Sequence, residues 1–180
     1  MPENVDIESI IDVSIRLPFH VSKWLMGDKE KLNITQYYSE KQHSMIWEFI
    51  PGPDTMGPPG LCHGGLLASI MDEGMGSFVF LNGHIVLTVN LQVNYRAPAP
   101  LNRIYFAISK LVRIESKRIY AECRITDIDN YLFASSSGLY IETSSWDEVE
   151  NPSVDFEKFK ILKKLLNEGT PLSEVLRKIS

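Results

Sequence analysis

The chain has 180 residues, of which 44% are hydrophobic and 23% are charged, and its formal net charge is −5. This length and composition predict one ordinary globular domain with enough apolar material for a core. The acidic balance argues against broad nucleic-acid binding and against a polybasic membrane surface, although a local basic cluster could still hold an anionic small ligand.

The predicted elements begin with a short helix within residues 6–17 and a strand over 44–50. The next stretch, residues 51–60, contains four prolines and three glycines, which exclude regular structure there. The apolar run from Gly64 to about Leu81 is too long for one strand and predicts a buried helix. Gly74 and Gly76 each weaken such a helix by about 1 kcal/mol relative to alanine, which indicates a close approach of whatever covers it.

Four strand-like segments follow at 85–97, 103–114, 118–128 and 131–142, and their short connections predict antiparallel neighbours. The first of them alternates. One face carries Leu87, Val89, Leu91, Val93 and Tyr95, and the other carries Thr88, Asn90, Gln92 and Asn94. A helix that ends near Gly169 and a last short helix after Pro171 complete the chain. This order predicts an α+β fold in which an antiparallel sheet wraps around one central helix.

Two cysteines, Cys62 and Cys123, are too few for a disulfide framework and favour a reduced, intracellular protein, which we expect in the cytoplasm. Cys62 beside His63 could be a nucleophile and its base, but adjacent residues on one element point apart. The first residues lack the basic start and apolar block of a secretory signal, and a mitochondrial location would require a transit peptide that has been removed. No stretch approaches the roughly 18 uninterrupted apolar residues of a membrane span.

Two neighbouring carboxylates, Asp72 and Glu73, lie inside the apolar helix. An ionised carboxylate is costly to bury unless it is paired or functional, so one of the two is a candidate catalytic acid. The two point about 100° apart, and spacing alone does not choose between them. At the start of the same helix, the His63-Gly64-Gly65 segment offers unobstructed N–H groups that could hold an oxyanion, although helices also begin with glycine for packing alone.

The segments HGGLLASIMDEGMG and TVNLQVNYRAPAPL resemble the hotdog-fold acyl-coenzyme A thioesterases, in particular thioesterase superfamily members four and five and the phenylacetate-pathway enzymes. The resemblance covers about Gly57 to Glu142. It implies a hotdog domain at residues 36–145, between an N-terminal extension (1–35) and a C-terminal helical tail (152–180). It also implies that Asp72 rather than Glu73 is the catalytic carboxylate and that Thr88 assists it.

By the same resemblance, His63 and Gly64, with Gly65 beside them, supply the oxyanion hole. The site would form across a homodimer, which could pair again into a tetramer, and the partner copy would cover the polar strand face that carries Thr88 and Asn90. The alternation by itself favours a simpler explanation, a monomer with a solvent-facing sheet. The asparagine or glutamine that precedes the histidine in some relatives is missing from residues 51–62.

The implied substrate is a fatty-acyl or aryl-acyl coenzyme A, and no cofactor is expected. Asp72 could activate a water or attack the thioester directly. Basic residues at strand ends are candidates for the nucleotide phosphates, the helix methionines are candidates for the acyl chain, and Asn90 is a further candidate contact. These basic residues are Arg96, Lys117 and Arg118, and the apolar candidates are Met71, Met75 and Phe78. A basic turn is usually just solvated, and such apolar residues are more often plain core.

Two other functions remain open at this stage. A hotdog protein could hold an acyl thioester, or a partner protein through its helical tail, without turnover. A hydratase of the same fold would need a different pairing of acid and histidine on the helix, which the chain does not contain. The retained acid and the glycines at the helix start favour the enzyme.

Overall fold

The computed structural model describes residues 7–12, 14–17, 32–143 and 156–179. The strands are β1 (Ile15–Arg16), β2 (Leu32–Ser39), β3 (Ser44–Pro51), β4 (Val86–Tyr95), β5 (Tyr105–Glu115), β6 (Arg118–Thr126) and β7 (Leu132–Glu142). The helices are α1 (Ile7–Asp12), α2 (Gly64–Leu81), α3 (Phe156–Asn167) and α4 (Leu172–Ile179), with a single 3-10 turn, η1 (Pro53–Thr55), inside the proline-rich segment.

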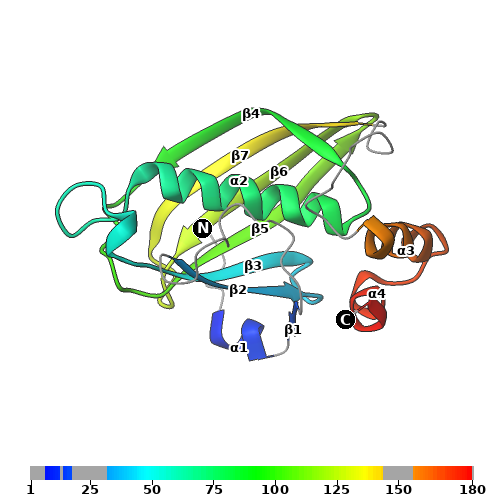
Figure 1. Ribbon diagram of the computed structural model, residues 1–180, viewed down its shortest axis with the longest axis horizontal. Helices are drawn as coiled ribbons and strands as arrows, with labels where there is room; N and C mark the ends of the chain where they lie inside the picture. The colour runs from blue at the N-terminus through cyan, green and yellow to red at the C-terminus, as the bar shows by residue number, and fades with distance from the viewer. Residues whose placement is uncertain (1–6, 13, 18–31, 144–155, 180) are drawn as a thin grey trace.

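One seven-stranded sheet forms the frame, in the order β1-β2-β3-β5-β6-β7-β4, and all neighbouring strands are antiparallel. Figure 1 shows α2 lying along one face of this sheet, with β4 at one edge. The α+β class is therefore confirmed. The predicted neighbours β5, β6 and β7 pair as expected, but β4 does not pair with β5, which follows it in the chain. It crosses to the far edge and pairs with β7.

Helix α2 is buried because apolar side chains surround most of its circumference. Its buried residues include Met71, Met75 and Phe78, which are all completely covered. A Cβ added at Gly74 would lie 2.9 Å from Ser109 Oγ on β5, so the expected close approach is confirmed there. It does not hold at Gly76, where the nearest atom would be 3.9 Å away, an ordinary contact distance.

The regular alternation expected for β4 is wrong at one position. Thr88 pairs with Tyr140 and Asn90 pairs with Leu139, so Val89 is an extra residue that forms a β-bulge. Because directly paired residues of antiparallel strands point to the same side of a sheet, Thr88 faces α2 together with Tyr140. Asn90 points to the opposite side. The bulge thus separates two residues that strict alternation puts on one face.

Described segments near both ends of the chain belong to the sheet and the core. Strand β2 spans the expected boundary between residues 35 and 36 and lies between β1 and β3, while most of the expected extension lies outside the described residues. Helix α4 contributes Leu172, Val175, Leu176 and Ile179 to the main core, together with Leu162 of α3. In Figure 1 α3 lies beside the C-terminal end of α2, and α4 lies beneath α3. The C-terminal helices therefore form part of the same folded unit.

Candidate active site

The carboxylate of Asp72 lies on the half-buried flank of α2, where it meets β4 and β7. Thr88 Oγ1 donates to it, at 3.1 Å from Oδ1 and 3.4 Å from Oδ2. The Tyr140 hydroxyl also donates to Oδ1, at 3.0 Å. Two hydroxyl groups from two strands therefore hold one acid of an otherwise apolar helix in a defined orientation. Asp72, rather than Glu73, is the acid that faces Thr88.

Tyr140 is the residue that the sequence reasoning missed. It is 1% exposed, on the side of β7 that faces α2. Burial, followed by the charge of Asp72 and the hydrogen bond to it, raises the pKa of Tyr140 well above its ordinary value of 10.0. The phenol is therefore a permanent hydrogen-bond donor. The available signal was a lone tyrosine at an inward position of the strand, two residues after Gly138.

The start of α2 presents one unpaired N–H group. The His63 N–H donates to Thr55 O at 2.9 Å, and the Gly65 N–H donates to His63 Nδ1 at 2.9 Å. No described residue accepts a hydrogen bond from the Gly64 N–H. The His63 side chain is thus the N-cap of the helix, and among the three residues only Gly64 keeps a backbone donor available for a ligand.

Tyr95 fixes the position of Gly64. Its hydroxyl donates to Gly64 O at 2.8 Å, and a Cβ added at Gly64 would lie 3.3 Å from the tyrosine ring. Glycine at this position lets the ring lie against the helix start. The edge strand β4 carries both Tyr95, which contacts Gly64, and Thr88, which contacts Asp72. One strand therefore contacts both residues that carry the candidate catalytic groups, the Gly64 N–H and the Asp72 carboxylate.

Within one chain the Asp72 carboxylate and the Gly64 N–H are far apart. Asp72 follows Gly64 by eight positions on the same helix. At a rise of about 1.5 Å per residue, their backbones are about 12 Å apart along the axis, so they do not meet at one reacting carbon.

The comparisons with known proteins agree with this arrangement of helix and sheet. Residues 59–134, which include Gly64, Asp72 and Thr88, match the thioesterase superfamily. The chain carries a thioesterase-superfamily domain. The match ends before Tyr140, so that residue lies outside the stretch that identifies the domain.

Named relatives of this thioesterase-superfamily domain are acyl-coenzyme A thioesterases. The chain is 35% identical over 108 residues to acyl-coenzyme A thioesterase THEM4 of Xenopus laevis, which is 59% of this chain and 48% of that relative. It is 29% identical over 113 residues to acyl-coenzyme A thioesterase THEM5 of Homo sapiens, which is 62% of this chain and 46% of the relative. The match thus spans about half the length of these proteins.

Solved structures confirm the hotdog fold of the thioesterase-superfamily domain. The PaaI protein of the E. coli phenylacetic acid degradation operon superimposes with a TM-score of 0.56 at 13% identity, covering 63% of this chain and 80% of that one. A hypothetical thioesterase from Streptococcus pneumoniae TIGR4, solved with coenzyme A, gives a TM-score of 0.56 at 18% identity, covering 64% of this chain and 90% of that one. At these identities the likeness establishes the fold alone.

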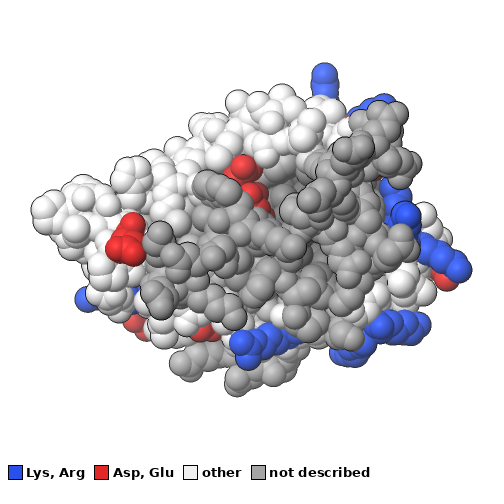
Figure 2. All heavy atoms as spheres, viewed as in Figure 1, with Lys and Arg blue, Asp and Glu red and all other residues white. Residues whose placement is uncertain are grey.

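The candidate coenzyme A residues of the thioesterase-superfamily domain are exposed but lie at opposite ends of β7. The Arg96 N–H donates to Phe133 O, whereas Arg118 pairs with Ile141 and Lys117 precedes it in the turn. These ends are about 25 Å apart along the strand. On the face shown in Figure 2, the visible lysines and arginines stand at the margin of the molecule. Met71, Met75 and Phe78 are core residues of this chain with no exposed surface.

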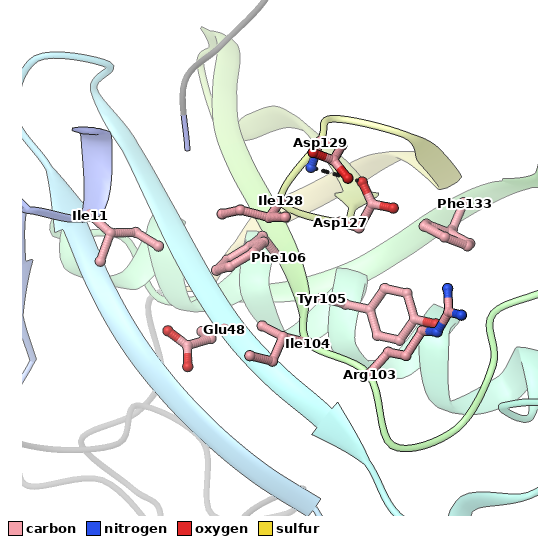
Figure 3. A pocket seen from close by; sticks show the side chains of 10 residues that line it. All are labelled: Ile11, Glu48, Arg103, Ile104, Tyr105, Phe106, Asp127, Ile128, Asp129 and Phe133. Atoms are coloured by element: carbon pink, nitrogen blue, oxygen red, sulfur yellow. Dashed lines mark hydrogen bonds between the residues drawn. The ribbon is translucent and has the colours of Figure 1, made fainter. Parts of the chain in front are cut away.

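A cavity of about 790 Å³ opens at the ends of β3, β5 and β6 (Figure 3). Apolar side chains such as Ile104, Phe106 and Ile128 line it, with Glu48 and Asp127 among its polar residues. Asp72, Thr88, Tyr140 and Gly64 do not line it, so the candidate catalytic groups of the thioesterase-superfamily domain lie elsewhere.

The described residues also bear on other kinds of site. They contain no group of three histidine, cysteine or acidic side chains placed to hold a metal ion. None of their helices combines the length and apolarity needed to span a bilayer. Both cysteines are buried, and burial raises the pKa of the Cys62 thiol to about 11, which leaves it protonated and a poor nucleophile near neutral pH.

Proposed function

We propose that this chain is an acyl-coenzyme A thioesterase that hydrolyses a fatty-acyl or aryl-acyl thioester to the free acid and coenzyme A. The observation that carries the proposal is the Asp72 carboxylate, which Thr88 and Tyr140 hold on the flank of an apolar helix. The names of the relatives and the coenzyme A in a solved structure of the same fold support the choice of substrate.

In this mechanism Asp72 acts as a general base. Its Oδ1 accepts from two hydroxyl groups, which lowers the nucleophilicity of the carboxylate, while Oδ2 has only the longer contact with Thr88. A water held at Oδ2 gives its proton to Asp72 as its oxygen attacks the thioester carbonyl carbon. The carbonyl oxygen becomes an oxyanion that accepts a hydrogen bond from the Gly64 N–H. When the C–S bond breaks, the thiolate takes the proton back from Asp72 and leaves as the thiol.

The active unit is a homodimer, because Asp72 and the Gly64 N–H of one copy are too far apart to act on one carbonyl. Strand β4 is a sheet edge, and its Leu87 and Val89 are each 58% exposed. A ten-residue strand at a sheet edge presents unpaired backbone N–H and C=O groups, which favour pairing with another chain. A two-fold axis at this edge reverses the direction of the second α2, so that the helix start of one copy approaches Asp72 of the other.

The same two-fold symmetry brings together basic residues that lie at opposite ends of β7 within one copy. Arg96 follows Tyr95, which contacts Gly64, and Arg118 lies next to Ile119, which pairs with Tyr140. In a site built from two copies, Arg96 of one copy and Arg118 of the other flank the same thioester. Both are exposed, so both are available to the phosphate groups of coenzyme A.

The experiment is thiol release from a panel of acyl-coenzyme A esters of different chain lengths, with the wild type compared with Asp72→Asn and Glu73→Gln. We expect the wild type to turn over at least one ester, Asp72→Asn to lose most of kcat, and Glu73→Gln to retain it. A wild type that binds these esters without releasing thiol would favour the alternative, a binding module. Loss of activity in Glu73→Gln but not in Asp72→Asn would show that Glu73, and not Asp72, is the catalytic carboxylate.

A further inference from the structure

The phenol of Tyr140 is held by two specific contacts, a hydrogen bond to Asp72 and close packing of its ring against Gly138. Its hydroxyl oxygen lies 3.0 Å from Asp72 Oδ1 and 3.3 Å from Asp72 O, so its single proton is directed at Asp72, with the carboxylate as the nearer acceptor. The ring leans along β7 over Gly138, where an added Cβ would lie only 2.6 Å from Tyr140 Cε2. Any larger residue at position 138 would therefore displace the ring. The glycine keeps the phenol directed at the carboxylate.

The two hydroxyl donors converge on one oxygen of the acid. Thr88 Oγ1 is nearer to Oδ1 than to Oδ2, and Tyr140 reaches Oδ1 as well. A carboxylate that accepts hydrogen bonds is stabilised in its ionised form. Thr88 is exposed and Tyr140 is buried, so solvent can compete for the first bond and has little access to the second.

We propose that Tyr140 is a positioning residue for the proposed thioesterase reaction, which fixes Asp72 Oδ1 so that Oδ2 faces the substrate. This role rests on the proposed function. Tyr140 itself touches neither substrate nor water in this scheme, and it neither gives up nor gains a proton during the reaction.

A purely structural role makes different predictions. If the tyrosine simply donates to the nearest acceptor, loss of its hydroxyl would lower stability and leave the kcat of the folded protein unchanged. Tyr105 provides that comparison within the same chain. It is completely buried on strand β5, and its hydroxyl donates to the backbone oxygen of Pro100 at 2.7 Å.

The test compares wild type, Tyr140→Phe and the control Tyr105→Phe in kcat and KM on one acyl-coenzyme A ester. Phenylalanine retains the ring, so both variants are expected to fold, which melting curves will check. For Tyr140→Phe we expect kcat to fall about tenfold and KM to change little. Tyr105→Phe should retain both kcat and KM.

Two results would overturn this role, and they are distinguishable. An active wild type with a Tyr140→Phe variant of equal kcat would remove the Tyr140 role and leave the proposed function intact. A wild type that is inert on every ester would remove the proposed function and this role with it. If Tyr140→Phe does not fold, Gly138→Ala, which displaces the ring, should lower kcat with little change in KM, and an unchanged kcat in that variant would contradict the role.

Discussion

Thr88 donates a hydrogen bond to Asp72, with Oγ1 3.1 Å from Oδ1, and the bulge at Val89 makes this contact possible. Without the bulge, strict alternation would put Thr88 and Leu91, which are three positions apart, on opposite sides of the sheet. With it, both face α2, so the same strand supplies a polar contact to the acid and an apolar contact to the core.

Removal of the Thr88 hydroxyl should therefore impair catalysis more than folding. We expect Thr88→Val to lower kcat by about ten- to a hundredfold, because a hydrogen bond to a charged group is worth roughly 1.5–3 kcal/mol. Thr88→Ser restores a hydroxyl at the same position and should recover most of the rate. Thiol release measures both variants. Equal rates for Thr88→Val and wild type would show that this contact has no role.

The Gly64 N–H can be removed with little disturbance of the helix. Proline is favoured at the first helical position, and the preceding residue, His63, already has the extended backbone that proline requires, with φ −65° and ψ 130°. Gly64→Pro should reduce kcat about a hundredfold or more, since it deletes a donor to the oxyanion. Gly64→Ala is the matched control, because it retains the N–H while also adding a Cβ against Tyr95. Equal losses in the two variants would assign the effect to crowding rather than to the lost donor.

The C-terminal helices should matter for stability rather than for chemistry. Leu176 of α4 is completely buried in the main core. Leu176→Ala should lower the free energy of unfolding by about 2–5 kcal/mol, measured by urea denaturation, while the folded variant retains its kcat. Arg177→Ala, at an exposed position on the same helix, should change stability by less than about 0.5 kcal/mol. Similar losses in both variants would contradict the packing described for α4.

The buried thiols should make the protein less stable at alkaline pH. Burial raises the pKa of Cys62 to about 11 and that of Cys123 to about 12, from an ordinary value of 9.0. Because the folded pKa values are the higher ones, this contribution to stability is complete below pH 9 and is lost as the pH rises through 11 and 12. By about pH 10 each thiol should cost about 1 kcal/mol. Urea midpoints should fall less steeply with pH in Cys123→Ala than in wild type, and parallel slopes would refute this.

Much of the fold follows from local patterns. Helix α2 begins and ends where the long apolar run predicts, and strands β5, β6 and β7 follow the expected segments. Strand β2 was missed, because its inward positions include Gln36, a polar residue that is 1% exposed and weakens the alternation of Leu32 and Ile34. A prediction that counts only apolar positions does not detect buried polar residues of this kind.

The parts of the site that escaped prediction depend on the three-dimensional arrangement. The far-edge position of β4 is a property of sheet order, which strand periodicity does not contain. The bulge at Val89 is a one-residue insertion that a strict period of two misassigns. The contact of Tyr140 with Asp72 joins residues 68 positions apart. By contrast, the link between Asp72 and Thr88 was expected from family resemblance, because both residues lie in the segments that carry it.

The central claim is that Asp72 of one copy works with the Gly64 N–H of another. Asp72→Asn and Gly64→Pro chains, co-expressed with different tags and purified through both, give heterodimers with one intact site and one doubly damaged site. The account predicts that each parent variant is nearly inactive and that the heterodimer recovers about half of the wild-type kcat per dimer. A heterodimer as inactive as its parents would mean that each site lies within one chain, and would contradict the account.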